Sequence, residues 1–113
     1  MENVQFEKAT LQHIGEIVEY VPNSVFTKTL IKKPTGHISV ISFDAGVGIK
    51  GEIYPFETFL LLLEGHAEII IDKKLSQLGA FEGIIIPAHS SYILKAIERF
   101  KVLSVTIKSG YED

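Results

Sequence analysis

The sequence predicts an all-β domain, a sandwich or a barrel, and three observations support this. From residue 25 onward apolar and polar residues tend to alternate, which is the two-residue period of strands. Gly, Pro, Asn and Asp interrupt this alternation at short intervals, so the strands must be short. Helical spacing is confined to the N-terminal segment. About seven to nine short strands with almost no helix are typical of a sandwich or barrel.

The composition of the chain argues against several classes of function. The 113 residues suffice for one domain that buries roughly two thirds of its unfolded surface. A net charge of -3 gives no basic surface for nucleic acid, and no apolar stretch approaches the roughly 18 residues of a membrane span. The chain has no Cys, hence no disulfide and no thiolate ligand or nucleophile. The N-terminus lacks the pattern of a secretory signal, so we expect a cytoplasmic protein without nucleic acid or membrane partners.

Residues 1–24 are expected to form an N-terminal arm that packs on the body. Leu11, Ile14, Ile17 and Val18 recur at helical spacing, which predicts one or two short helical turns. A turn follows Pro22, and the two-residue period begins after it. Residues 25–113 are therefore expected to form a single β domain.

The strands of this domain are predicted from the alternation and the turns. Residues 25–31 and 37–43 should form a hairpin, because a Lys-Lys-Pro-Thr-Gly turn joins them. Residues 46–51 are expected to form a loop, because three glycines there permit positive backbone angles or close approach. Further strands are expected at residues 59–63, 67–71, 84–86, 92–97 and 99–107.

The strand at residues 59–63, FLLLL, is apolar on both faces. Such a strand must be covered on both faces, by the second layer of a sandwich or by another subunit. We therefore expect a homodimer, which would also cover exposed sheet edges.

One stretch carries a motif spacing. Gly46 is followed after five residues by Glu52, then by Tyr54 and Thr58, and six residues later by Gly65. This spacing resembles the first motif of the cupin superfamily, specifically of its small single-domain members, and the resemblance covers about residues 25–108. In that motif two histidines and a glutamate bind a metal. Here Glu52 and Tyr54 stand at the histidine positions, and Thr58 stands at the glutamate position.

The second cupin motif is recognisable in the same way. Pro87 fits the motif, whereas Phe81 and His89 replace its two glycines, Tyr92 takes its histidine position and Ala96 its asparagine position. The resemblance implies a jelly-roll β-sandwich or barrel that closes round a small pocket. The metal chemistry does not transfer with it.

The absence of histidines from the matched motif positions bears on whether the protein holds a metal cofactor. A typical cupin centre holds its metal with three imidazoles and one carboxylate, because borderline divalent ions favour neutral nitrogen donors. Only Glu52 remains a strong ligand among the matched positions. We expect no cofactor; the alternative that a divalent metal is held by Glu52, His89 and Tyr92 stays open.

The resemblance places the pocket mouth at the loop of residues 46–56 and the turn of residues 87–92. Strand alternation then predicts a mostly apolar pocket with a few polar groups at one end. The side chains expected to line it are Glu52, Tyr54, Thr58, Leu60, Leu62, Tyr92 and Leu94.

These expectations leave several functions open. The first is a barrel that binds a small organic ligand at a degenerate metal site. The second is an enzyme, either a metal-free isomerase or epimerase that uses Glu52 with Tyr54 or Tyr92 as acid and base, or a metal-dependent enzyme with a non-standard ligand set. The third is a barrel that only mediates assembly. Fold alone does not choose among them.

Overall fold

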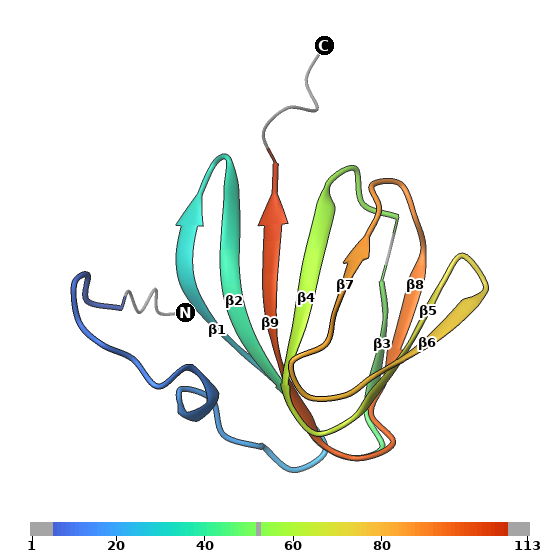
Figure 1. Ribbon diagram of the computed structural model, residues 1–113, viewed down its shortest axis with the longest axis horizontal. Coiled ribbons are helices and arrows are strands. Elements are labelled where there is room, and N and C mark those ends of the chain that lie inside the picture. Colours follow the sequence, from blue (N-terminus) through green and yellow to red (C-terminus); the bar gives the residue numbers. More distant parts are fainter. Residues whose placement is uncertain (1–5, 52, 109–113) are drawn as a thin grey trace.

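Two antiparallel sheets face each other in the computed structural model, which describes residues 6–51 and 53–108 (Figure 1). The larger sheet has the strand order β1-β2-β9-β4-β7, and the smaller one has the order β3-β8-β5-β6. The predicted all-β jelly-roll sandwich is confirmed. The strands are β1 (Val25–Lys33), β2 (Gly36–Phe43), β3 (Gly48–Gly51), β4 (Glu57–Glu64), β5 (Ala67–Ile71), β6 (Lys74–Leu78), β7 (Gly83–Ile86), β8 (Tyr92–Lys95) and β9 (Phe100–Ile107).

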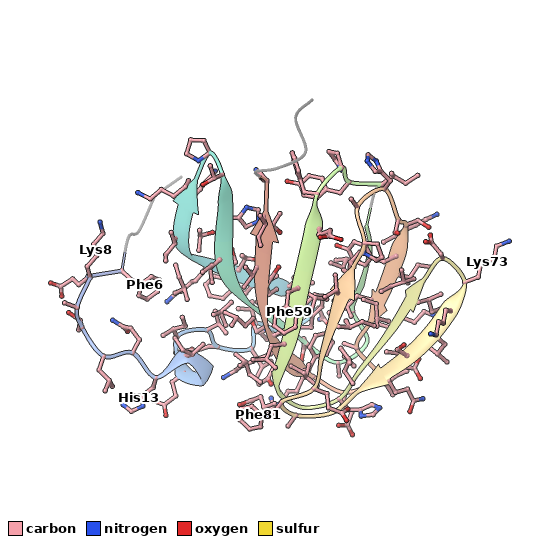
Figure 2. The ribbon with its side chains drawn as sticks, turned by 45° about the horizontal axis from the view of Figure 1, so that its top comes forward. Phe6, Lys8, His13, Phe59, Lys73 and Phe81 are labelled. Atoms are coloured by element: carbon pink, nitrogen blue, oxygen red, sulfur yellow. The ribbon has the colours of Figure 1, made fainter. Side chains whose placement is uncertain are left out.

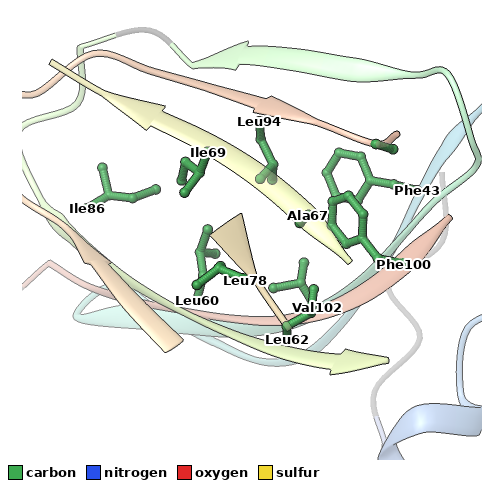
Figure 3. Packing of buried hydrophobic residues seen from close by; sticks show 11 residues of the cluster. Phe43, Leu60, Leu62, Ala67, Ile69, Leu78, Ile86, Leu94, Phe100 and Val102 are labelled. Atoms are coloured by element: carbon green, nitrogen blue, oxygen red, sulfur yellow. The ribbon is translucent and has the colours of Figure 1, made fainter. Parts of the chain in front are cut away.

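The inner faces of the two sheets form the hydrophobic core at one end of the sandwich. Phe43 and Phe100 are both fully buried, and their rings stack with centroids 4.4 Å apart (Figure 3). Leu62 and Val102 from the same sheet and Ile69 from the opposite one complete this tightly packed end. The apolar residues at alternate positions therefore close the sandwich at the end opposite the turn between β1 and β2.

The N-terminal segment contains one short helical turn, a 3-10 helix (Ile14–Glu16), as the helical spacing predicted. Of the apolar residues that predicted helix, Val18 is buried, whereas Leu11 is 79% exposed. The segment runs outside β1, as Figure 2 shows. It is attached to the outer face of the larger sheet by two hydrogen bonds: the Ser42 hydroxyl donates to Glu19 O at 2.7 Å, and Lys101 Nζ donates to Gly15 O at 2.6 Å.

The division of the chain at residue 24 stays a prediction. Within the part of the chain that the structure describes, no helix has the length and apolar character needed to cross a membrane.

The prediction of a loop throughout residues 46–51 was wrong, because residues 48–51 form β3 and pair with β8. Of the three glycines that suggested a loop, Gly46 has a positive φ, whereas Gly48 and Gly51 are required by close approach. A Cβ added at Gly48 would lie 2.9 Å from Leu94 O, and one added at Gly51 would overlap the Tyr92 ring. The strand β6, at the edge of the smaller sheet where it pairs with β5, was not predicted.

The strand β4 is apolar on both faces, as predicted, but residues 6–51 and 53–108 cover only one of them fully. Leu60 and Leu62 point inward and are buried. The outer face carries a row of five apolar residues, one from each strand of the larger sheet, in which Ile31, Phe59 and Ile85 are 50%, 40% and 58% exposed. In strand order, the row consists of Ile31, Ile38, Val105, Phe59 and Ile85.

Candidate functional site

A cavity of about 450 Å³ lies between the two sheets, above the packed core. Its apolar floor and walls come from both sheets, and Figure 3 shows several of these side chains facing one another. They include Ile41, Ile49, Leu60, Ile86, Leu94 and Val102. The cavity opens at the end of the sandwich that holds the turn between β1 and β2, drawn at the top of Figure 1.

Polarity increases toward the mouth along the inner face of the larger sheet. The innermost row is apolar, since Ile41 pairs with Val102. One row higher, Ser39 pairs with Ser104. At the mouth, strand pairing aligns Lys32, His37, Thr106, Thr58 and Ile86 in one row across all five strands.

Thr58 and Thr106 are joined by a hydrogen bond between their hydroxyl oxygens, 2.9 Å apart. Both residues line the cavity, and Thr106 is only 4% exposed. Because each hydroxyl can donate one hydrogen and accept others, the pair keeps acceptor capacity for a molecule in the cavity. Thr58, which stands where the cupin motif has its carboxylate, is therefore part of a neutral hydroxyl pair.

Tyr92 reaches the cavity from β8 in the opposite sheet. Its ring lies over Gly51, its partner in the pairing of β3 with β8, where any larger side chain would collide with it. Burial raises the pKa of the Tyr92 hydroxyl, because the phenolate would lose solvation there. At neutral pH this residue is therefore a hydrogen-bond donor and acceptor, not an anion.

His37 provides an imidazole at the mouth of the cavity. Partial burial lowers its pKa below the ordinary 6.5, and the positive charges of Lys108 and Lys32 lower the pKa further. The imidazole is therefore neutral at pH 7, with one nitrogen that donates and one that accepts.

The rim of the mouth is held by contacts between loops. The His89 backbone N–H donates a hydrogen bond to Tyr54 O at 2.7 Å, which ties the loop after β7 to the loop before β4. The Tyr54 ring meets the Phe56 ring edge-on at 5.0 Å. Lys108 Nζ lies 5.8 Å from the centroid of the Phe56 ring, so an ammonium group is placed at the rim.

The structure brings most of the predicted pocket residues together. Tyr54, Thr58, Leu60, Tyr92 and Leu94 line the cavity. Leu62 does not line it, because this residue lies deeper on β4, fully buried in the core.

Two predicted site residues stand apart from this group. His89 is exposed and lies outside the lining, where its backbone, not its imidazole, contributes to the rim. Glu52, the residue on which the acid-base and metal alternatives depended, lies outside the described residues.

Five polar residues of the lining were not predicted: Lys50, Ser90 and, on the larger sheet, the three residues His37, Ser104 and Thr106. The last three lie on β2 and β9, strands in which both alternating sets contain apolar residues. Alternation therefore gave no signal as to which set faces inward. The pairing of Thr106 with both His37 and Thr58, which gathers them at one level, follows only from the sheet register.

The described residues do not fit the metal centre that the cupin motifs imply. No group of three or more His, Cys, Asp or Glu side chains in residues 6–51 and 53–108 is placed to hold a metal ion. At the motif positions Tyr92 is a protonated phenol, and the Thr58 hydroxyl is paired with Thr106. Neutral hydroxyl groups are weak ligands compared with the imidazoles and carboxylates that hold divalent transition metals.

Comparison with known proteins places this architecture in a family. No family model and no curated protein matches the sequence. The structure is similar to a conserved protein of unknown function from Streptococcus pyogenes, with a TM-score of 0.84 and 28% identity over 95% of this chain and 92% of that chain. It is similar to a cupin superfamily protein from Desulfitobacterium hafniense, with a TM-score of 0.81 and 27% identity over 94% of this chain and 95% of that chain.

A third similar structure is a cupin 2 conserved barrel domain protein from Leptotrichia buccalis. The TM-score is 0.78 at 25% identity, and the match covers 82% of this chain and 45% of that chain. The strand order, the cavity between the sheets and these likenesses agree with the motif spacing around residues 46–65 and 81–96. The described residues form a small cupin-type domain, similar to members of the cupin superfamily.

Proposed function

We propose that this chain binds a small organic molecule in the cavity between its sheets, without the metal centre of typical cupins. A volume of about 450 Å³ lies within the range of small-molecule sites, roughly 300–1,000 Å³. The apolar floor suits the body of such a molecule, and the hydroxyl groups and imidazole at the mouth suit its polar substituents.

The observation that carries this proposal is an inversion of polarity at the mouth. On the larger sheet, the row with His37, Thr106 and Thr58 faces inward, while the neighbouring row with Val105 and Phe59 faces outward. Taken by themselves, these two rows would remove more apolar surface from water in the reverse orientation, although Phe43 and Phe100, deeper on β2 and β9, hold the strands in the observed one. Local violations of this kind are expected at functional sites, where polar groups are kept for a ligand.

Ligand screening with a matched pair of variants tests the proposal. A metabolite library is screened by thermal shift, and hits are measured by isothermal titration calorimetry. Ser104→Leu adds bulk inside the cavity, so it should weaken binding at least tenfold while the circular dichroism spectrum is retained. Gln77→Leu adds a similar group on the exposed surface of β6 and should bind like the parent. Failure of the folded parent to bind any compound, or equal binding by the two variants, would contradict the proposal.

An enzymatic function is a second candidate, and one specific observation favours it. His37 and Tyr92 lie on opposite walls of the cavity, and their pKa values are displaced in opposite directions, so a base and an acid coexist at neutral pH. In an epimerisation, the imidazole would take a proton from a carbon beside a carbonyl, and the Tyr92 hydroxyl would give a proton to that carbon from the opposite face.

Isotope exchange distinguishes catalysis from binding. An enzyme of this kind should incorporate deuterium from D₂O at that carbon of a bound ligand, and His37→Gln and Tyr92→Phe should each abolish the incorporation. The alternative that uses Glu52 as the base predicts instead that Glu52→Gln abolishes it while His37→Gln does not. A ligand that binds without exchange excludes both versions for that ligand.

We also propose that the chain forms a homodimer through the outer face of the larger sheet. Support comes from the apolar row of Ile31, Ile38, Val105, Phe59 and Ile85, which spans about 19 Å at the spacing of neighbouring strands. Contiguous exposed apolar patches of this kind mark protein interfaces.

Sedimentation at micromolar concentration tests this assembly. The parent should sediment as a dimer and Phe59→Asp, which places a charge in the middle of the row, as a monomer. Leu75→Asp is the matched control, because Leu75 is an exposed apolar residue of the smaller sheet and should leave the dimer intact. A monomeric parent would overturn the proposal.

A further inference from the structure

We infer that the ligand of this cavity is an organic anion, whose carboxylate or phosphate group is held at the mouth by Lys108 and His37 while its apolar part occupies the floor. The inference rests on the proposed binding function and adds the chemical class of the ligand. It follows from the position of Lys108, from the charges around the mouth and from the protonation of His37.

Two contacts and one electrostatic effect locate Lys108 at the rim. Its backbone N–H donates to Thr35 O at 2.7 Å, which holds the residue beside the turn between β1 and β2. Its Nζ lies 5.8 Å from the centroid of the Phe56 ring, and Phe56 lines the cavity. Its charge also acts on the His37 imidazole. The ammonium group is therefore close to the mouth and can reach a ligand that enters it.

Among the described residues, the two charges that act on His37 are both positive. Lys32 lies directly opposite His37 in the pairing of β1 with β2, and it acts on the imidazole in the same direction as Lys108. Among the described residues that line the cavity there is no carboxylate. A cleft that carries one sign of charge between apolar walls attracts ions of the opposite sign.

His37 is suited to respond to an anion. The charged groups that face it are Lys32 from β1 and Lys108 after β9, and its neighbour on β9 is the uncharged Thr106. A nearby anion favours the imidazolium, so binding should raise the pKa of His37 and promote proton uptake. The bound anion would then receive charge-assisted hydrogen bonds from both the imidazolium and the Lys108 ammonium.

The polar groups near His37 limit where the anionic group sits. Thr58 and Thr106, in the same row as His37, are already hydrogen-bonded to each other; Ser104 lies one row below them, and the innermost row is apolar. Desolvating a full negative charge in that apolar floor would cost free energy, and Lys50, the one described lysine of the lining, is exposed on β3. The anionic group of the ligand should therefore bind at the rim, and the uncharged apolar part of the ligand should occupy the floor of the cavity.

Matched pairs of probes test the inference directly. The probes are 4-methylbenzoate and 4-methylbenzamide, hexanoate and hexanamide, and phenyl phosphate as a phosphate source. Binding is followed by NMR shifts of backbone amides around the cavity, and the pKa of His37 is measured from its ring proton with and without saturating probe. Each carboxylate should bind at least tenfold more tightly than its amide, and the pKa of His37 should rise on binding.

Lysine variants assign the effect to Lys108. Lys108→Met should weaken carboxylate binding about tenfold, which corresponds to one charge-assisted hydrogen bond, and should leave amide binding unchanged. Lys108→Arg should retain the preference for the anion, which shows that the charge and not the fold of the variant matters. Lys74→Met removes the same charge from the distant strand β6 and should bind like the parent.

The outcomes separate this inference from the function on which it rests. Amides that bind as tightly as the carboxylates, or an unchanged pKa of His37 on saturation with carboxylate, would overturn the anion inference and leave a neutral ligand for the same cavity. Absence of binding by all probes and by every library compound would refute the binding function itself. Tighter binding of phenyl phosphate than of 4-methylbenzoate would identify phosphate as the anionic group.

Discussion

Replacing Gly51 by alanine should destabilise the protein only as long as the Tyr92 ring is present. An added Cβ at Gly51 would overlap three carbon atoms of that ring, so the ring or β3 must shift. Overpacking of this kind costs about 1–3 kcal/mol. The backbone conformation at Gly51 is compatible with alanine, because Gly51 is not among the glycines with a positive φ.

The effect of Gly51→Ala on stability should change sign once the Tyr92 ring is removed. In a Tyr92→Ala background the collision is absent, and Gly51→Ala then reduces the conformational entropy of the unfolded chain, which stabilises the fold by about 0.4–1 kcal/mol. The two substitutions should therefore couple by about 2 kcal/mol, roughly a 30-fold effect on the folding equilibrium.

Urea denaturation of the parent, Gly51→Ala, Tyr92→Ala and the double variant measures this coupling. Unfolding is followed by circular dichroism at one fixed protein concentration. For a chain of this size the single Gly51→Ala variant should lose about 1 M in its midpoint. Gly15→Ala is the control, because an added Cβ there meets nothing within 4 Å, and its midpoint should change little. Additivity within about 0.5 kcal/mol would refute the placement of the Tyr92 ring over Gly51.

Three further predictions concern the mouth and the arm. Thr58→Val and Thr106→Val should each destabilise the protein by about 1 kcal/mol, whereas the double variant should cost less than their sum, because no hydroxyl is left without its partner. A strictly additive denaturation result would contradict this pairing. Because the pKa of His37 is lowered in the folded state, stability should fall as the pH drops through 6.5 toward that lower value, and His37→Gln should flatten this part of the curve. An unchanged slope in denaturation between pH 7 and pH 5 would exclude this role. Lys101→Met should accelerate hydrogen exchange in residues 14–18, because Lys101 Nζ donates to Gly15 O; protection equal to the parent's would show that the arm does not depend on this bond.

Several features of the fold could be predicted from local sequence. The hairpin of β1 and β2 was recognisable because a polar turn with Pro and Gly separates two strands with β-branched residues. The region of the mouth was also recognisable, since the spacing around Tyr54, Thr58 and Tyr92 matched known motifs and all three residues line the cavity. Each of these predictions depended on residues close together in the chain or on a spacing already known from other proteins.

Other features depended on contacts between strands that are distant in sequence. β3 was predicted as a loop, because a glycine that is required by the ring of Tyr92 looks the same in sequence as a glycine that permits a turn. Leu62 was predicted to line the pocket, because alternation assigns a face to a residue but not its depth along the strand.

The sequence by itself determined the class of the fold, the resemblance to cupins and the absence of the three imidazoles from the motif positions, because composition, periodicity and motif spacing are properties of neighbouring residues. Only the tertiary structure decided that His37, Thr106 and Thr58 form one row at the mouth, with Lys108 at the rim. The physical reason is register. A shift of one residue in the pairing of β2 and β9 would turn this polar row outward, but it would also expose Phe43 and Phe100, which are fully buried deeper on the same faces, so the core at the other end of the strands fixes the register.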